Sequence, residues 1–334
     1  MPPLKMRKAH EMFVLKPITC NLSPNMRRIT LLTNPDVCNL HCPLCFLNQR
    51  KGAEHVNLGC ESRIWGSRSF GEMSFETARA AIEKYAAERD SSGKSILREV
   101  IPSTMGEPLL YSHFDELLEV CESLGIPLNL TTNGTFPGKW GSDAGMATLL
   151  HACSDIKISY LASEQFEGWT ANVEKFVDVR RKLMACDAEQ GGDAANSMLN
   201  ARSLGIATVS LQVTLHKKNV DDVAEIVSWA SSVGINRIKW NPVVFLSVAP
   251  QGLREQYALD DVQLESLRKE LRTGVLPAAN VRHEGSLFFN NGTDRCAVGG
   301  KCESCPFADE VWVWPDGHED HCPNPERRWS KVHT

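Results

Sequence analysis

The sequence has 334 residues, of which 42% are hydrophobic, and its formal net charge is −5. This length suits one large domain with an appendage or two domains, and the composition is ordinary for a soluble globular protein. The negative balance provides no basic field for nucleic acid. Because no apolar run reaches the roughly 18 residues of a membrane span, and the start of the chain lacks a signal-peptide core, we expect a cytoplasmic protein without a membrane partner.

Strand-like and helix-like segments alternate along the chain, after a lead-in segment over residues 1–28. Short apolar runs predict strands at 28–33, 96–101, 126–131, 155–160, 207–215 and 237–241. Apolar residues at helical spacing predict helices at 74–89, 113–124, 145–153, 169–184, 220–233 and 259–271. Alternation of this kind predicts a parallel α/β sheet built from right-handed units. Periodicity alone leaves a partial barrel and a doubly wound sheet both open.

The chain has 12 cysteines, and seven of them form two groups. In a chain without an export signal, such numbers indicate metal binding rather than a disulfide framework. The first group follows the first predicted strand, where Cys38, Cys42 and Cys45 have the spacing C-x3-C-x2-C. Thiolates select zinc, Cu(I) or iron–sulfur clusters, and iron–sulfur clusters ordinarily take four cysteines. Three cysteines leave either one open iron or a remote fourth ligand, and a zinc knuckle is the alternative.

This loop resembles the signature of the radical S-adenosylmethionine (SAM) superfamily, although Leu44 stands where an aromatic residue commonly precedes the third cysteine. The resemblance implies an α/β fold, a partial (β/α)6 barrel. It also implies that Cys38, Cys42 and Cys45 hold a [4Fe-4S] cluster whose fourth iron is chelated by SAM. One electron would then cleave SAM to a 5′-deoxyadenosyl radical, which removes a hydrogen atom from substrate.

The ends of the predicted strands carry further resemblance, because ligands of parallel α/β folds bind at the carboxyl ends of strands. Gly106 and Glu107 follow the second strand and are similar to the family's glycine-glycine-glutamate motif, with Met105 replacing the first glycine. The resemblance implies that this segment accepts hydrogen bonds from the SAM ammonium, with Gly106 allowing close backbone approach and Glu107 supplying negative charge. Asn133, after the third strand, is expected to bind ribose or substrate.

The later strands supply three more candidate cofactor-binding residues. Ser159 ends the fourth strand, Gln212 lies in the fifth, and Asn241 ends the sixth, where family members line the adenine pocket. Lys239 is expected to face solvent, and an inward-facing substrate-binding cation is the alternative.

The second cysteine group is Cys296, Cys302, Cys305 and Cys322, in a segment rich in glycine and proline. Such a segment has a small hydrophobic core, so a bound metal ion would be needed to stabilise its fold. It resembles the short auxiliary-cluster extension called a twitch domain, which implies a second, auxiliary [4Fe-4S] cluster; a zinc ribbon is the alternative. The expected domains are therefore the lead-in, a radical SAM core over 29–272 and an extension over 273–334.

The amino-acid sequence of the cysteine loop also resembles that of radical SAM enzymes of aminoglycoside biosynthesis. This resemblance implies an epimerase of a small aminoglycoside-like substrate, served by an external electron donor of flavodoxin or ferredoxin type. Cys296 is then the candidate catalytic hydrogen donor, or else the fourth auxiliary ligand. If it is the donor, Cys302, Cys305 and Cys322 need another partner, for which Cys60 or Cys20 is possible. A dehydrogenase of an aminoglycoside alcohol, a peptide-modifying twitch enzyme and a non-catalytic zinc scaffold are the alternatives.

Overall fold

A computed structural model describes residues 27–51, 71–102, 105–161, 167–189, 205–246, 249–273, 281–288 and 310–320. The strands are β1 (Arg27–Leu31), β2 (Leu97–Pro102), β3 (Leu128–Thr132), β4 (Cys153–Tyr160), β5 (Thr208–Leu215), β6 (Arg237–Pro242), β7 (Arg282–Glu284), β8 (Glu310–Val313) and β9 (Glu319–Asp320). The helices are α1 (Phe46–Lys51), α2 (Phe75–Ala86), α3 (Phe114–Ser123), α4 (Asp143–Ala152), α5 (Trp169–Glu189), α7 (Val223–Val233), α8 (Gln251–Tyr257) and α9 (Asp261–Thr273), with short 3-10 turns at Pro108–Leu110, Gly138–Gly141 and Ser286–Phe288.

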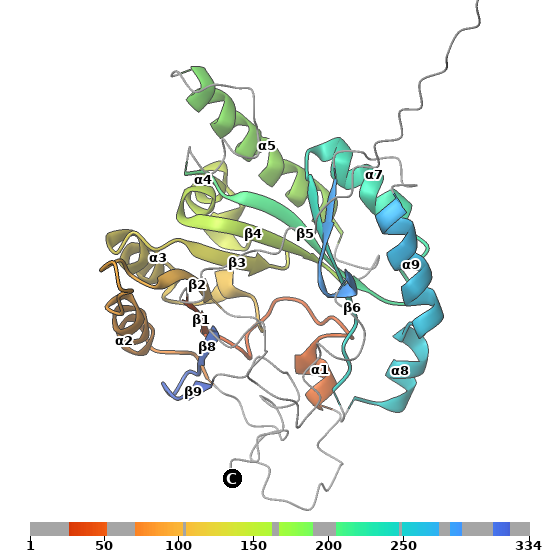
Figure 1. Cartoon of the computed structure of the whole chain (residues 1–334), viewed down its shortest axis with the longest axis horizontal. Helices are drawn as coiled ribbons and strands as arrows, with labels where there is room; N and C mark the ends of the chain where they lie inside the picture. Colours follow the sequence, from red (N-terminus) through yellow and green to blue (C-terminus); the bar gives the residue numbers. More distant parts are fainter. Residues whose placement is uncertain are drawn as a thin grey trace, which may run out of the picture.

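The strands form one sheet in the order β7-β6-β5-β4-β3-β2-β1-β8-β9 (Figure 1). Strands β1 to β8 all pair in parallel, and β9 returns antiparallel to β8. The six strands expected from the sequence are β1 to β6, which confirms the parallel α/β class. The sequence prediction missed α1, α8 and β7 to β9. Of these, β8 extends the sheet on the far side of β1, with Arg28 aligned with Glu310.

Helix boundaries follow local backbone chemistry. Ser74 begins α2, because its hydroxyl oxygen accepts a hydrogen bond from the Thr77 amide at 3.1 Å. Helix α7 ends at Gly234, which has a left-handed backbone with φ 96°. It begins at Val223 rather than at the predicted residue 220, because the Asn219 side chain closes a turn there. The side-chain amide of Asn219 donates to the Thr214 carbonyl, and its side-chain oxygen accepts from the His216 backbone amide.

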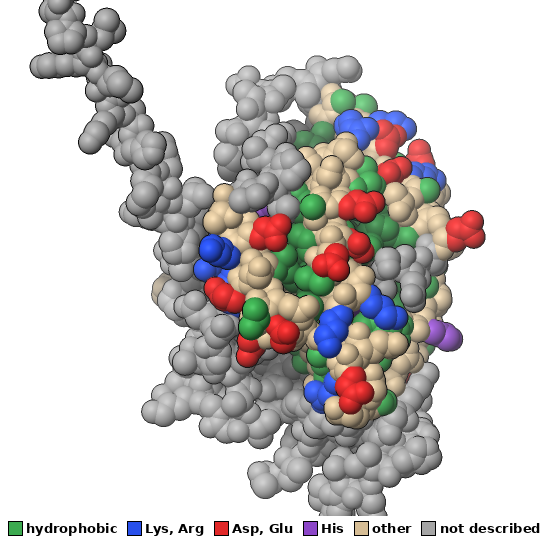
Figure 2. Space-filling view, turned by 90° about the vertical axis from the view of Figure 1, so that its right-hand side faces the viewer, with side chains coloured by type: hydrophobic (Ala, Val, Ile, Leu, Met, Phe, Trp, Pro, Cys, Tyr) green, Lys and Arg blue, Asp and Glu red, His purple; other side chains and the backbone are tan. Residues whose placement is uncertain are grey.

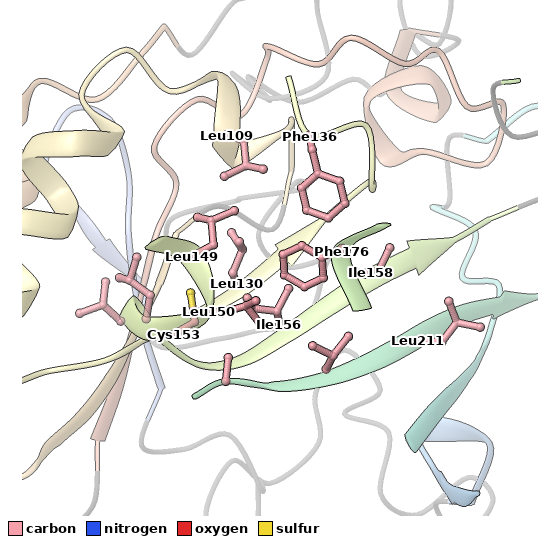
Figure 3. Packing of buried hydrophobic residues seen from close by; sticks show 14 of the residues in the cluster. Leu109, Leu130, Phe136, Leu149, Leu150, Cys153, Ile156, Ile158, Phe176 and Leu211 are labelled. Atoms are coloured by element: carbon pink, nitrogen blue, oxygen red, sulfur yellow. The ribbon is translucent and has the colours of Figure 1, made fainter. Parts of the chain in front are cut away.

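The hydrophobic core lies between the sheet and its covering helices. Leu130, Ile156 and Ile158, from β3 and β4, are fully buried and lie around Phe176 of α5 (Figure 3). Leu211 of β5 is also fully buried. Side chains alternate between the two faces of a strand. The opposite face, here called the inner face, therefore carries mainly polar residues. They include Glu99, Asn129, Asp155, Lys157, Ser159, Thr208, Gln212 and Lys239. Among the helices that the structure describes, none has both the length and the apolar character to cross a bilayer.

Candidate active site

The three-cysteine loop begins just after β1 and ends at α1, on the carboxyl-end side of the sheet (Figure 1). Cys38, Cys42 and Cys45 are half-buried thiols. The amide of Cys45 donates to the Cys42 carbonyl at 3.1 Å, and this turn begins the chain's passage into α1. The Asn48 side chain donates to the same carbonyl at 2.7 Å. The loop therefore has a defined local fold that places three sulfurs on one short segment.

The chemistry of these three thiols fits a cationic cluster. Burial and the neighbouring Cys45 and Cys38 thiolates raise the pKa of Cys42 to about 11. Burial also raises the pKa of Cys38, and the nearby Glu107 carboxylate adds to the shift. Three thiolates this close together repel each other unless a cation lies between them. Among the described residues, no three Cys, His, Asp or Glu side chains converge as ligands of a single metal ion.

The Gly106-Glu107 segment packs against the backbone at the start of the cysteine loop. The Glu107 amide donates to the Val37 carbonyl at 2.8 Å, and the Asn34 side-chain amide donates to the Glu107 carbonyl at 2.7 Å. Gly106 has φ +73°, and a Cβ there would lie 2.2 Å from the Asn34 carbonyl oxygen and 2.6 Å from that of Val37. The close approach that the sequence analysis expected at Gly106 is thus made, in this structure, to the cysteine loop itself.

The Glu107 carboxylate is 1% exposed and joins the ends of β2 and β3. It accepts hydrogen bonds from the Thr132 hydroxyl at 2.7 Å, the Asn133 amide at 2.7 Å and the Leu109 amide at 3.3 Å. Burial raises its pKa to about 7, although these three donors oppose the shift. Its two oxygens are therefore already bonded within the protein, and the group carries a full negative charge only above that pKa.

Asn133 connects the end of β3 to the first cysteine. Its side-chain amide donates to the Asn39 side-chain oxygen at 2.8 Å and approaches the Cys38 sulfur at 3.7 Å. Its own side-chain oxygen accepts from the Thr135 amide at 2.9 Å, and Asn39 in turn donates to the Thr135 hydroxyl at 2.9 Å. In this structure Asn133 orients the loop, while the ribose or substrate contact expected of it stays a prediction.

The remaining candidate cofactor-binding residues follow the inner face across the sheet. Ser159 on β4 is aligned with Gln212 on β5, and Gln212 with Lys239 on β6. The Asn241 side-chain oxygen accepts a hydrogen bond from the Ser286 amide at 3.0 Å. The sheet therefore brings Ser159 and Gln212 together, and Asn241 lies one inner-face position beyond Lys239.

Lys239 does not face solvent, so that expectation is wrong. Its side chain is 20% exposed, and its ammonium lies 3.4 Å from the Asp155 carboxylate on the inner face. Lys157 and Arg237 contact the same carboxylate, and the structure thus reveals a charged group that the sequence analysis missed. The alternating pattern of β6 could have predicted this position. Ile238 and Trp240 are apolar and face the core, so Lys239 must lie on the opposite face, together with Asn241.

Gln49 is a second residue that the sequence analysis did not single out. It is 1% exposed, and its side chain links α1 to the segment after β6. Its amide donates to the Leu44 carbonyl at 2.8 Å and to the Val244 carbonyl at 3.2 Å, and its oxygen accepts from the Leu246 amide at 2.8 Å. One side chain therefore fixes the end of the cysteine loop to the strand end where the adenine pocket was expected.

Replacing Gln49 by alanine should lower the free energy of unfolding by about 1–3 kcal/mol, because buried partners lose their hydrogen bonds. The amide of Leu246 should also exchange with solvent faster. Hydrogen-exchange mass spectrometry measures that rate, and Gln251→Ala, which removes only an exposed bond to Glu255, is the control. Unchanged protection at Leu246 in Gln49→Ala would show that this link does not hold the segment.

Several predicted residues lie outside the described residues. They are the four cysteines of the second group, Cys296, Cys302, Cys305 and Cys322. Cys20 and Cys60, named as possible partners for that group, also lie outside.

No family model matches the chain. The 7,8-dihydro-6-hydroxymethylpterin dimethyltransferase of Methanocaldococcus jannaschii is 32% identical over 128 residues, which are 35% of this chain and 20% of that protein. Among solved structures, Streptococcus suis SuiB bound to S-adenosylmethionine has a TM-score of 0.53 at 14% identity, covering 89% of this chain and 60% of SuiB. The structure of anSMEcpe with bound AdoMet has a TM-score of 0.55 at 13% identity, covering 89% of this chain and 71% of that one.

The chain has the fold of these S-adenosylmethionine-bound proteins. The parallel α/β fold expected from the sequence, with a partial (β/α)6 barrel as what the family resemblance implied, is confirmed at the level of its class, and the sheet is open. At these identities the likeness establishes the fold alone. The chain spans only a fifth of the curated relative and about three fifths of SuiB, so activity and substrate are matters for the proposal below.

Proposed function

We propose that this protein is a radical SAM enzyme that removes a hydrogen atom from a carbon of its substrate. The observation that carries the proposal is the loop of Cys38, Cys42 and Cys45, held at the strand ends of an S-adenosylmethionine-binding fold by Gly106 and Asn133. These cysteines would hold a [4Fe-4S] cluster, which when bound supplies the electron that cleaves SAM. An external flavodoxin or ferredoxin would be the source of that electron.

The chain's own residues have distinct parts in this proposal. Gly106 and Glu107 fix the backbone under the loop, and the charge on Glu107 lies near Cys38, where a SAM ammonium would be attracted. Asn133 orients the loop through its hydrogen bonds. The inner-face residues Ser159, Gln212 and Asn241 would contact the ribose and adenine of SAM.

We further propose that the substrate is a peptide. Two solved structures of the same fold support this: SuiB was solved with its precursor peptide SuiA, and anSMEcpe with AdoMet and the Kp18Cys peptide. The inner face adds a physical argument. Three cations surround Asp155 there, and they would repel a polycationic aminoglycoside.

Epimerisation of an aminoglycoside is the second candidate function, and the sequence resemblance of the cysteine loop favours it. In this reaction Cys296 would return a hydrogen atom from the face opposite to the one attacked. Replacing Cys296 by alanine would then stop inversion but leave deuterium transfer from substrate to 5′-deoxyadenosine intact. In the peptide reading, Cys296, Cys302, Cys305 and Cys322 would instead hold the auxiliary cluster.

The test is anaerobic turnover in heavy water with SAM, reductant and iron-reconstituted protein. A pooled peptide library and neomycin C serve as separate probes, and mass spectrometry follows both products and 5′-deoxyadenosine. A modified peptide formed with 5′-deoxyadenosine supports the first candidate. One unit of mass gained at a non-exchangeable sugar carbon supports the epimerase, and loss of two units supports the dehydrogenase. If bound SAM is never cleaved, the radical SAM proposal is wrong.

A further inference from the structure

The inner face of the sheet carries three cations around a single carboxylate. Asp155 accepts from Arg237 and from the Thr208 hydroxyl at 2.8 Å through one oxygen. Its other oxygen lies 3.7 Å from the Lys157 ammonium and 3.4 Å from that of Lys239. Their side chains are only 11–20% exposed, so water screens these charges weakly. Burial lowers the pKa of Lys239, and it lowers that of Lys157 to about 8.

Two further carboxylates share their charge with other cations. Glu99 lies 3.5 Å from Arg28, which also pairs with Glu310, and its charge partly offsets the lowering of the Lys157 pKa. Glu284 pairs with Arg282 and likewise partly offsets the lowering of the Lys239 pKa. The connected group therefore has one more cation than it has carboxylates: Arg28, Lys157, Arg237, Lys239 and Arg282 against Glu99, Asp155, Glu284 and Glu310. Enclosed charges are normally paired, because desolvation without a partner is costly. The outer face over α7, α8 and α9 differs, since acidic and basic side chains are interspersed there (Figure 2).

The excess charge lies next to the proposed cofactor row. Lys239 is aligned with Gln212, and Gln212 with Ser159, which we assign to SAM. From that level the Lys239 side chain reaches toward Asp155, deeper on the inner face. An anionic group held by the Lys239 ammonium would therefore lie deeper than the proposed cofactor row, and the carbon chain that carries it would extend toward the cofactor, as hydrogen transfer requires.

We infer that Lys239, with Lys157 and Arg237 behind it, binds a carboxylate of the substrate. Resting on the proposed function, this assignment narrows the substrate to a peptide with an acidic side chain or chain end near the modified carbon. Arginine and lysine form charge-assisted hydrogen bonds to carboxylates, which are about twice as strong as neutral ones. Asp155 keeps the cations in place in the absence of substrate.

The test compares isosteric peptide probes on the full chain. The probes are acetyl-Gly-Glu-Gly-amide and acetyl-Gly-Gln-Gly-amide, and ligand-observed NMR titration gives the dissociation constants. The acidic probe should bind saturably and about tenfold more tightly than the neutral one, and Lys239→Gln should remove that preference. Lys175→Gln, which removes an equal charge from an exposed pair with Asp143, should keep it.

Three results would overturn the inference. They are equal binding of the two peptides, equal loss in Lys239→Gln and Lys175→Gln, and saturable binding of inorganic phosphate without binding of the acidic peptide. The same titration with folded Asp155→Asn protein is a second test. Removing the competing carboxylate should tighten binding of the acidic probe. The titration needs no SAM cleavage. Measuring 5′-deoxyadenosine in the same preparation therefore separates failure here from failure of the radical SAM proposal.

Discussion

Replacing Gly106 by alanine will displace the three-cysteine loop and lower the free energy of unfolding by about 2–5 kcal/mol. The added Cβ would overlap two backbone carbonyls, those of Asn34 and Val37, neither of which can rotate away like a side chain. The residue would also keep a φ of +73°, which costs an L-amino acid about 1–2 kcal/mol. Iron content after anaerobic reconstitution should fall together with stability, because the displaced backbone carries Cys38.

Gly125 provides the matched control for this change. Its φ of +66° is similar, but no atom lies within 4 Å of an added Cβ. Gly125→Ala should therefore show only the backbone cost, about 1–2 kcal/mol, and retain full iron binding. Denaturant unfolding measures both variants. Equal destabilisation of the two would mean that the contact between Gly106 and the cysteine loop contributes nothing.

Replacing Glu107 by glutamine should destabilise the protein by about 1–3 kcal/mol at pH 4.5, below the folded-state pKa of the carboxyl group. A protonated carboxyl group can still accept at both oxygens from its three donors, whereas a glutamine offers them only one acceptor oxygen. Its amide would then face either the Asn133 amide or the Thr132 hydroxyl. Chemical denaturation of both proteins measures the difference, with Glu83→Gln as an exposed control on α2.

The same pair of proteins should reveal the raised pKa of Glu107. Its folded-state pKa is about 7, against 4.5 in the unfolded chain, so the folded state binds the proton more tightly. This stabilisation is fully present below pH 4.5 and is lost as the pH rises to about 7. The stability of the wild type relative to Glu107→Gln should therefore fall across that window, by an amount on the order of 3 kcal/mol. A constant difference across it would contradict a raised pKa.

Much of the fold could be predicted from the sequence, because each central strand is short, apolar on one face and followed by a helix with its own apolar stripe. The three-cysteine loop, Gly106 and Asn133 were placed correctly at the ends of β1, β2 and β3 for the same reason. What the pattern could not give was the pairing of β8 with β1, which joins residues such as Arg28 and Glu310 that are far apart in the chain. Pairing at that distance depends on tertiary packing rather than on local propensity.

The interactions within the site were less predictable than its location. The motif resemblance predicted that Glu107 and Asn133 bind SAM, whereas in the structure they contact the cysteine loop and each other. Residue type alone does not say which of several nearby partners a carboxylate or amide will bond. The inner-face charges around Asp155 come from three strands, and only their alignment in the sheet brings them onto one carboxylate.

The central claim is that Cys38, Cys42 and Cys45 hold a cluster that cleaves SAM. The most direct measurement reconstitutes the full chain anaerobically and records iron content, the visible and paramagnetic resonance spectra, and 5′-deoxyadenosine. We expect a [4Fe-4S] signal and 5′-deoxyadenosine from the wild type and from Cys186→Ala, which removes an exposed thiol on α5. Cys38→Ala, Cys42→Ala and Cys45→Ala should each lose both. Normal SAM cleavage in any of these three variants, or zinc in place of iron in the wild type, would contradict the central claim.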